Sequence, residues 1–231
     1  FALPIGLKLG GPSQDGQPRA LVLAPTRELA NQVEAVFSTT LATLGLRCLS
    51  IIGGSSYARQ KKTLRDGVDI VVGTPGRIAD LIRQNSLQLK QIQCFVLDEV
   101  DQMLDIGFAE ELNVVKDALP TEIQVLFFSA TIDRQMIRVT EKMLRHPVRL
   151  DLSSEDATPP NIEHACLLVK NDQRLGALIN LLLFHAPKQA MLFCATREEC
   201  REVASALESR GFNAAPISGD LSQEAREDTL K

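Results

Sequence analysis

The chain has few aromatic residues and no excess of basic over acidic ones, two features on which many nucleic-acid-binding proteins depend. Among its 231 residues there is no tryptophan and a single tyrosine, Tyr57, and aromatic residues make up 4%. Base-stacking platforms need exposed aromatic side chains, so this composition argues against a single-strand-binding protein of that type. The formal net charge of −4 excludes binding of polyanions through overall charge, so any nucleic-acid contact must come from a local basic cluster.

Cysteine pairs and long apolar runs are also lacking. The cysteines are Cys48, Cys94, Cys166, Cys194 and Cys200. No C-x-x-C pair occurs among them, which favours buried, reduced thiols over a zinc site or a disulfide framework. The longest apolar stretch, near Ala177–Phe184, is too short to span a bilayer, and no basic-then-apolar signal opens the chain. We therefore expect no membrane partner and, by elimination, a cytoplasmic location.

What remains is the composition of a globular protein, with 45% hydrophobic and 23% charged residues. Short aliphatic runs alternate with segments of helical spacing, for example Val33, Val36 and Phe37 on one expected helix face. Near-continuous apolar strands between helices indicate an α/β fold with a parallel sheet covered on both faces. The expected strands are Ala20–Ala24, Leu49–Ile52, Asp69–Val72, Cys94–Leu97, Val125–Phe128, Ile162–Val169, Ala190–Cys194 and Ala214–Ile217.

One stretch interrupts this alternation. Residues 151–160 read DLSSEDATPP, which is polar and acidic and ends in two prolines, so neither a helix nor a strand should cross it. We therefore expect an N-terminal domain over residues 1–150, a linker over 151–160 and a shorter C-terminal domain over 161–231. In the C-terminal domain, Thr196 and Glu199 have the spacing of a capping box, which predicts a helix directly after the strand that precedes them.

Polar residues and glycines cluster where the expected strands end. The groups after the five strands of the N-terminal domain are PTRE (25–28), GGS (53–55), TPGR (74–77), DEVD (98–101) and SAT (129–131). In open α/β sheets, ligands bind beyond the carboxyl ends of the strands, so these groups should share one surface. Each group also has a simpler interpretation, as a turn, a helix N-cap or a solvated charge. Their joint placement on one edge favours a functional surface.

The acidic group suggests catalysis. FVLDEVDQML (95–104) begins with apolar residues and then places Asp98, Glu99 and Asp101 within four positions. Such a strand end suits a hydrated Mg²⁺ held through Asp98, with Glu99 orienting and deprotonating a water. The alternative is a set of acids that interact favourably with the N-terminus of a following helix, and the motif alone does not decide between the two.

Taken together, these groups resemble the motifs of the DEAD-box family of ATP-dependent RNA helicases. Seven matches occur in the family's order and approximate spacing, which makes the resemblance specific and extends it over essentially the full chain. The matching segments are PTRELA (25–30), the glycine pair (53–54), TPGR (74–77), DEVD (98–101), SAT (129–131), LFCATR (192–197) and GDLSQEARE (219–227). The resemblance implies two RecA-like, doubly wound parallel-sheet domains that use ATP and Mg²⁺ to clamp RNA and unwind short duplexes.

The resemblance also implies roles for individual residues. It assigns Asp98 to Mg²⁺, Glu99 to the general base, and Asp101 to a link with the SAT motif. Ser129 and Thr131 of that motif would couple the nucleotide state to domain closure. The residues expected at the RNA sugar-phosphate backbone are Arg27, Gly54, Thr74, Gly76, Arg77, Thr196, Arg197, Gly219, Asp220 and Gln223. Such contacts would not depend on RNA sequence, because phosphates carry no base identity.

Two positions depart from the family's usual pattern. Val100 stands where alanine is most frequent, and its extra methyl groups would cost about 1–3 kcal/mol in a turn that does not relax around them. We expect the surroundings to accommodate Val100, since the flanking acids are kept. Ser218 replaces a frequent histidine before Gly219-Asp220, which weakens the assignment of those two residues.

A phosphate-binding loop of the form G-x-x-x-x-G-K-[ST] does not occur, because the sequence contains no Gly-Lys dipeptide. In the family this loop lies upstream of an FALPI-like segment, which here is residues 1–5, and the arginine-finger motif would follow residue 231. We therefore expect a chain truncated at both ends, with the P-loop part of the first domain missing and the second domain incomplete. Alone, it should be catalytically inactive.

Two other functional classes stay open. The chain could serve as a non-catalytic fragment that binds RNA or a protein partner. It could also come from a DNA-directed motor of the same superfamily, which competition between RNA and DNA would reveal, because 2′-hydroxyl contacts distinguish the two.

Overall fold

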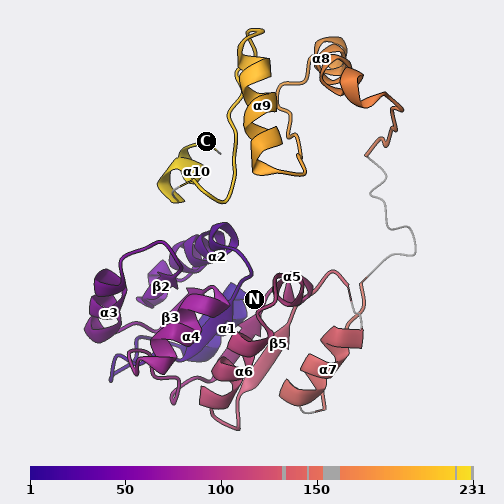
Figure 1. Ribbon diagram of the computed structural model, residues 1–231. Helices are drawn as coiled ribbons and strands as arrows, with labels where there is room; N and C mark the ends of the chain where they lie inside the picture. The colour runs from indigo at the N-terminus through magenta and orange to yellow at the C-terminus, as the bar shows by residue number, and fades with distance from the viewer. Residues whose placement is uncertain (132–133, 145, 153–161, 222, 230–231) are drawn as a thin grey trace. The chain divides into compact units, whose positions relative to one another are not determined.

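The chain divides into two compact units, unit 1 over Phe1–Arg149 and unit 2 over Leu150–Lys231 (Figure 1). The computed structural model describes residues 1–131, 134–144, 146–152, 162–221 and 223–229. Of the linker expected over 151–160, the part from residue 153 onward lies outside the described residues.

Unit 1 is built around a five-stranded parallel sheet with the order β2-β3-β1-β4-β5. The strands are β1 (Ala20–Leu23), β2 (Cys48–Ile51), β3 (Ile70–Gly73), β4 (Cys94–Leu97) and β5 (Gln124–Phe127). Each strand expected in this part of the chain is confirmed, with ends that differ by no more than one residue. The central strands β1, β3 and β4 are fully buried, as expected for a parallel sheet covered on both faces.

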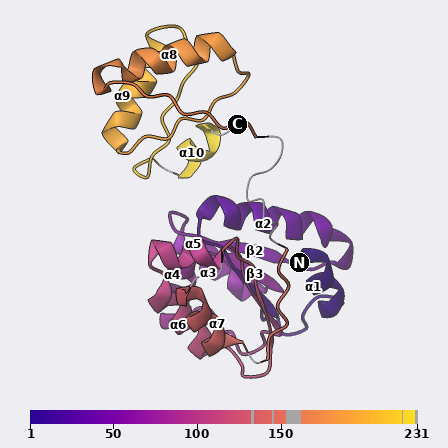
Figure 2. The same cartoon turned by 90° about the vertical axis from the view of Figure 1, so that its right-hand side faces the viewer.

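Helices connect the strands and cover both faces of the sheet (Figure 2). They are α1 (Ala2–Leu9), α2 (Arg27–Thr40), α3 (Tyr57–Asp66), α4 (Pro75–Arg83), α5 (Val100–Ile106), α6 (Ala109–Ala118) and α7 (Arg134–Met143), with a 3₁₀ turn η1 (Ala42–Leu44). This alternation of strand and helix confirms the doubly wound α/β fold for unit 1.

Two apolar clusters form the core, one on each face of the sheet. Phe95 and Leu97 point to the face covered by α4, α5 and α6, whereas Val96 points to the face covered by α1 and α2. This division follows from the strand geometry, since successive side chains alternate between faces. Within α2, Val33 and Phe37 are buried, but Val36 is 51% exposed, so its assignment to the same helix face was wrong. Successive helical residues are about 100° apart, which carries Val36 away from the buried stripe.

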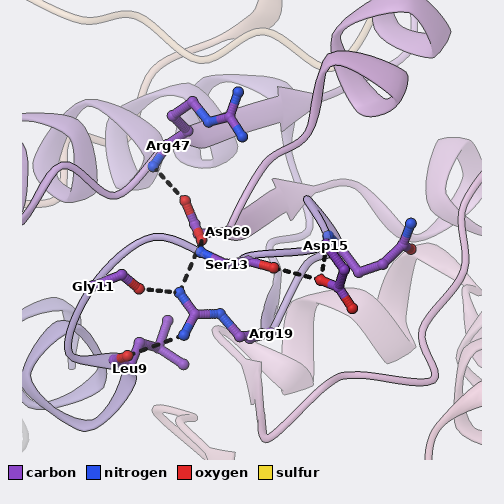
Figure 3. A network of polar contacts seen from close by, with 8 residues as sticks. Leu9, Gly11, Ser13, Asp15, Arg19, Arg47 and Asp69 are labelled. Atoms are coloured by element: carbon purple, nitrogen blue, oxygen red, sulfur yellow. Dashed lines mark hydrogen bonds and ion pairs between the residues drawn. The ribbon is translucent and has the colours of Figure 1, made fainter.

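A buried carboxylate fixes the opposite, amino edge of the sheet (Figure 3). The Asp69 side chain is fully buried and accepts hydrogen bonds from the backbone N–H groups of Ser13 and Arg47. It also pairs with the Arg19 guanidinium at 2.8 Å. Arg19 in turn donates to the carbonyl oxygens of Leu9 and Gly11. The network ties the loop after α1 to the start of β1 and β3, because a buried charge is stable only when paired and hydrogen-bonded.

The described residues of unit 2 form helices but not the strands expected there. Its helices are a 3₁₀ turn η2 (Asn171–Gln173), α8 (Arg174–His185), α9 (Arg197–Glu208) and α10 (Gln223–Thr229). The segments Ile162–Val169, Ala190–Cys194 and Ala214–Ile217 form no strand in the described residues, so these three expectations were wrong. Their side chains are mostly exposed. A parallel strand needs neighbours that satisfy its backbone N–H and C=O groups, and the described residues of unit 2 do not bring such neighbours together.

The cysteines and the helix lengths bear on two expectations about the whole chain. All five cysteines are free thiols, but the expectation that they are buried holds for Cys94 alone. Cys166 is exposed, and the others, Cys48, Cys194 and Cys200, are half-buried. None of the helices in the described ranges is long and apolar enough to cross a membrane.

Candidate functional site

The carboxyl edge of the unit 1 sheet gathers the strand-end groups in a definite order. Following the strand order, the edge carries Gly53-Gly54 after β2, Thr74–Arg77 after β3, Arg27 after β1, Asp98–Asp101 after β4, and Ser129–Thr131 after β5. Basic side chains and glycines therefore occupy the half of the edge formed by β2, β3 and β1. Carboxylates and hydroxyls occupy the half formed by β4 and β5.

The acidic half begins directly at the end of β4. The Asp98 N–H donates to the Leu23 carbonyl at 3.0 Å, and the Val100 N–H donates to the Phe128 carbonyl at 3.1 Å. These bonds fix the turn between its two neighbouring strands. Val100 is fully buried within the core cluster on the α5 side of the sheet, so the packing accommodates the residue that departs from the usual alanine.

The backbone of Glu99 has a conformation that residues other than glycine rarely adopt. It precedes α5 with φ 53° and ψ 55°, the left-handed region, and its side chain makes no capping hydrogen bond. Backbone strain of this kind costs about 1–3 kcal/mol and persists where the surrounding structure enforces it, often at functional sites. Glu99 makes no capping hydrogen bond, whereas Asp101 lies in the first turn of α5, where a carboxylate interacts favourably with the helix N-terminus.

Asp101 links the acidic motif to the SAT motif. Its Oδ2 accepts hydrogen bonds from the Thr131 N–H and from the Thr131 hydroxyl, both at 3.0 Å. Ser129 Oγ donates to the Thr131 carbonyl at 2.7 Å. The three residues thus form one hydrogen-bonded unit across the ends of β4 and β5, with the Thr131 hydroxyl engaged by Asp101.

The three carboxylates of the motif differ in their electrostatics. Burial raises the pKa of Asp98, against a smaller opposing effect of the hydrogen bond from the Glu99 N–H. Burial also raises the pKa of Glu99, and the negative charges of Asp98 and Asp101 add to this effect. Partial burial acts in the same sense on Asp101, but the hydrogen bonds from Thr131 and Gln102 outweigh it, so the pKa of Asp101 is lowered.

The acidic half offers few protein ligands for a metal ion. Within the described ranges, no group of three or more His, Cys, Asp or Glu side chains gathers to hold a metal ion. Mg²⁺ needs no such cage, because it keeps several waters and binds through one or two carboxylates together with substrate phosphates. A half-buried Asp98 at a rigid strand end fits a hydrated Mg²⁺ of this kind.

In the basic half, Arg27 lies against the glycine turn. A Cβ atom at Gly53 would lie 3.2 Å from Arg27 Nη2, and one at Gly54 would lie 2.8 Å from Nη1. Gly54 has φ 84°, so both its conformation and the close approach of Arg27 favour glycine. The turn interpretation is thus correct for this pair, and it is compatible with a binding surface. Thr26 is the N-cap of α2, where its Oγ1 accepts from the Leu29 N–H at 3.2 Å.

Thr74, Gly76 and Arg77 lie together at the start of α4. Thr74 is buried and is the N-cap residue, Pro75 opens the helix, and the first turn contains Gly76 and Arg77. Arg77 Nη1 reaches across to the β2–α3 loop, where it donates to the Ser55 carbonyl at 3.0 Å and to Gln60 Oε1 at 2.9 Å. Arg27 and Arg77 therefore flank the same loop, Gly53–Ser56.

Unit 2 brings most of its own expected site residues together. Thr196 caps α9 by accepting from the Glu199 N–H at 3.1 Å, as the spacing predicted. Glu199 Oε2 accepts in return from the N–H of Ala195 at 3.0 Å, one residue before the N-cap position of a standard capping box. A Cβ atom at Gly219 would lie 3.6 Å from Arg197 Nη2. Asp220 accepts hydrogen bonds from Ser218 and Arg201. Gln223 is the first residue of α10.

Comparison with known proteins decides the family. A model described as DEAD/DEAH box helicase matches residues 1–139, and one described as helicase conserved C-terminal domain matches residues 173–231. The chain belongs to the DEAD/DEAH box helicase family. The DEAD-box ATP-dependent RNA helicase CshA of Geobacillus kaustophilus is 37% identical over 231 residues, covering 100% of this chain and 49% of the relative. The ATP-dependent RNA helicase DeaD of Buchnera aphidicola subsp. Schizaphis graminum (strain Sg) is 37% identical over 215 residues, covering 93% of this chain and 36% of the relative.

Solved DEAD-box structures share the fold. A DEAD box protein from Methanococcus jannaschii matches with a TM-score of 0.59 and 34% identity, over 100% of this chain and 61% of that chain. S. cerevisiae Dbp5 bound to RNA and ADP BeF3 matches with a TM-score of 0.85 and 26% identity, over 99% and 59%. The RecA-like α/β fold class is thereby confirmed. The chain spans between 36% and 54% of the length of these curated DEAD-box relatives.

Two residues at the carboxyl edge of the unit 1 sheet, Gln60 and Tyr57, were not predicted from the sequence. Gln60 is buried and bridges Arg77 to the Ile52 carbonyl, to which its Nε2 donates at 3.0 Å. The Tyr57 ring lies over the Arg77 guanidinium, with 3.7 Å between Arg77 Cζ and the ring centroid. The sole tyrosine of the chain, placed two residues after GGS, was the available signal.

Proposed function

We propose that this chain is a segment of an ATP-dependent RNA helicase that couples ATP hydrolysis to RNA clamping and local duplex unwinding. The observation that carries the proposal is the division of one sheet edge into an acidic half, with Asp101 bonded to Thr131, and a basic half around the Gly53–Ser56 loop. The names of the relatives, and a fold neighbour bound to RNA and ADP BeF3, support ATP and RNA as ligands.

In the acidic half, each carboxylate has a distinct task. When bound, ATP would supply the phosphoryl group, and Mg²⁺ would neutralise the negative charge of its phosphates. Asp98 would hold the ion through its carboxylate, and Glu99 would accept the proton of the attacking water. The raised pKa of Glu99, caused first by burial and then by Asp98 and Asp101, makes it a stronger base. Asp101, Ser129 and Thr131 transmit the state of this site along the edge.

In the basic half, RNA is held through its phosphates. The residues assigned to this contact are Arg27, Gly54, Thr74, Gly76 and Arg77 in unit 1, and Thr196, Arg197, Gly219, Asp220 and Gln223 in unit 2. Guanidinium forks and backbone N–H groups suit phosphate oxygens, so the contact is independent of RNA sequence. We place the protein in the cytoplasm, where five free thiols would stay reduced.

Replacing the proposed base tests the reaction. In a full-length helicase that contains this segment, Glu99→Gln should lower RNA-stimulated ATP hydrolysis by about 10²–10⁴-fold while ATP-dependent RNA clamping is retained. The matched control is Glu122→Gln, the same change at an exposed position before β5, at the amino edge of the sheet. Full turnover by Glu99→Gln would show that Glu99 is not the base.

The 231 residues by themselves are expected to bind RNA and to hydrolyse ATP negligibly, because the sequence contains no Gly-Lys phosphate loop. Micromolar ATP affinity with RNA-stimulated turnover by this chain would contradict that expectation. RNA affinity that never responds to nucleotide in the full-length protein would favour the non-catalytic binding fragment instead.

A further inference from the structure

Tyr57 contacts Arg77 in a way that no expected role explains. Tyr57 is the first residue of α3, and its ring lies with its centroid 3.7 Å from Arg77 Cζ. The Tyr57 hydroxyl donates to Asp80 Oδ2 at 2.9 Å, one helical turn further along α4. The ring is therefore anchored to α4 at its hydroxyl end while its face covers the guanidinium.

Gln60 holds the same guanidinium from another side. Its Oε1 accepts from Arg77 Nη1 at 2.9 Å, and its Nε2 donates to the Ile52 carbonyl at 3.0 Å. Gln60 is only 4% exposed, so this amide is a rigid support that connects Arg77 to the end of β2. Arg77 Nη1 also donates to the Ser55 carbonyl at 3.0 Å.

These contacts occupy one edge and one face of the guanidinium and leave other donors unused. Among the residues that the structure describes, both hydrogen bonds of the Arg77 side chain start from Nη1. The Nη2 and Nε donors lie on the remaining sides of the planar fork, a geometry that matches phosphate oxygens. An arginine fixed in this way loses less side-chain entropy on binding than a free one.

We propose that Tyr57 and Gln60 are positioning residues that hold Arg77 as a preformed fork for an RNA phosphate beside the Gly53–Ser56 loop. The proposal rests on the proposed function and extends it to two residues outside the family motifs. Tyr57 acts through its ring face, so the hydroxyl bond to Asp80 is secondary. The guanidinium covers one face of the ring.

Equilibrium RNA binding by the 231-residue chain tests the role of the ring. A labelled single-stranded RNA of ten nucleotides is titrated at several salt concentrations, with fluorescence anisotropy as the readout. Tyr57→Leu should weaken binding about two- to fivefold, whereas Tyr57→Phe, which keeps the ring, should stay within about 1.5-fold of wild type. Arg77→Gln should weaken binding more and reduce the salt dependence by one phosphate contact. Lys62→Gln removes one charge from an exposed position of α3 and is the matched charge control.

The double variant separates positioning from general destabilisation. If Tyr57 acts through Arg77, adding Tyr57→Leu to Arg77→Gln should cause no further loss of affinity. A further two- to fivefold loss in the double variant, or wild-type affinity for Tyr57→Leu alone, would overturn the positioning role. Circular dichroism and urea unfolding confirm that each variant is folded.

A measurement without RNA tests the positioning of Arg77 separately from the proposed function. In nuclear magnetic resonance spectra, the Arg77 Nε–H resonance should be displaced by the ring in wild type and Tyr57→Phe. It should return to the position of a free arginine in Tyr57→Leu. An undisplaced wild-type resonance would overturn the positioning, whatever RNA does. A displaced resonance with no RNA binding by wild type would instead contradict the phosphate assignment and the proposed function.

Discussion

Phe95 and Phe193 both lie in short aliphatic runs with the pattern of a buried strand, but their surroundings are opposite. Phe95 is fully buried in the middle of β4, whereas Phe193 is 91% exposed. The same contrast extends over the two units. Unit 1 has two apolar clusters, one on each face of its sheet. Among the described residues of unit 2, only Ala204 and Leu207 are buried, and both lie in α9.

The difference shows what an apolar pattern specifies. In unit 1, β1 pairs with β3 and β4, and every central strand has a neighbour on each side. The apolar runs of unit 2 have no such partners among its described residues, and an isolated strand leaves its backbone polar groups unpaired. Helices satisfy their own backbone, which explains why α8 and α9 form where strands do not.

The largest expected difference between the two units comes from replacing each phenylalanine by alanine. Phe95→Ala should lower the free energy of unfolding of unit 1 by about 3–5 kcal/mol, because it leaves a cavity in a close-packed core. Phe193→Ala should change stability by less than about 0.5 kcal/mol. Urea unfolding followed by circular dichroism measures both. Equal losses in the two variants would mean that the Phe193 segment is packed in solution.

A second pair of variants compares the stability contributed by a buried ion pair in unit 1 with that of an exposed one in unit 2. Asp69→Asn removes the charge opposite Arg19 in a site where the carboxylate is fully buried, and should cost about 3 kcal/mol. Asp220→Asn removes the charge opposite Arg201, whose side chain is 58% exposed, and should cost less than about 1 kcal/mol. Hydrogen exchange at the start of β1 and β3 should report the first change. An Asp69→Asn variant as stable as wild type would contradict the role given to the buried network.

Helix caps should behave alike in both units, because they are local. Thr26→Ala and Thr196→Ala each remove one side-chain acceptor from a helix N-terminus, and each should cost about 1 kcal/mol. The loss is measured by hydrogen exchange of the first turns of α2 and α9. The conservative variants Thr26→Ser and Thr196→Ser serve as controls and should retain most of the protection. A much smaller effect at Thr196 would show that the contrast between the units reaches local structure.

The smallest expected effect is a pH dependence within unit 1. The lowered pKa of Asp101 means that its contribution to stability is present above the ordinary value of 3.8 and is lost as pH falls through the folded pKa. The pKa values of Asp98 and Glu99 are raised in the folded state, so these two groups have the opposite effect on stability. Their ionisation lowers the free energy of unfolding as pH rises from the ordinary pKa through the folded pKa. Asp98→Asn should therefore raise stability at neutral pH, and Asp101→Asn should lower it. Carboxyl titration by nuclear magnetic resonance would refute this if all three titrated at ordinary values.

Sequence alone predicted the parts of the fold that depend on local and nearest-neighbour cues. The strand Cys94–Leu97 agrees at both ends, because four apolar residues are bounded by Gln93 and Asp98. The N-cap at Thr196 agrees because its hydrogen bond from the Glu199 N–H lies within one helical turn. The strand Ile162–Val169 failed because a strand also requires partners, which its own residues do not encode.

The candidate site was predictable to the same extent. Parallel topology brings the ends of neighbouring strands together, so the meeting of Asp101 with Thr131 followed from the strand assignment. The contact between Tyr57 and Arg77 did not, because it depends on how α3 packs beside α4 and on side-chain rotamers. The roles assigned to individual residues stay predictions until the variants are measured.

The left-handed backbone at Glu99 has a consequence for how this sequence can vary. Glycine and asparagine adopt φ 53° more easily, so a sequence selected for folding alone would place one of them at position 99. Glutamate at this position therefore lowers the stability of the fold relative to glycine or asparagine. In a collection of random variants ranked only by thermal stability, position 99 should drift away from glutamate, and screening on activity should bring it back.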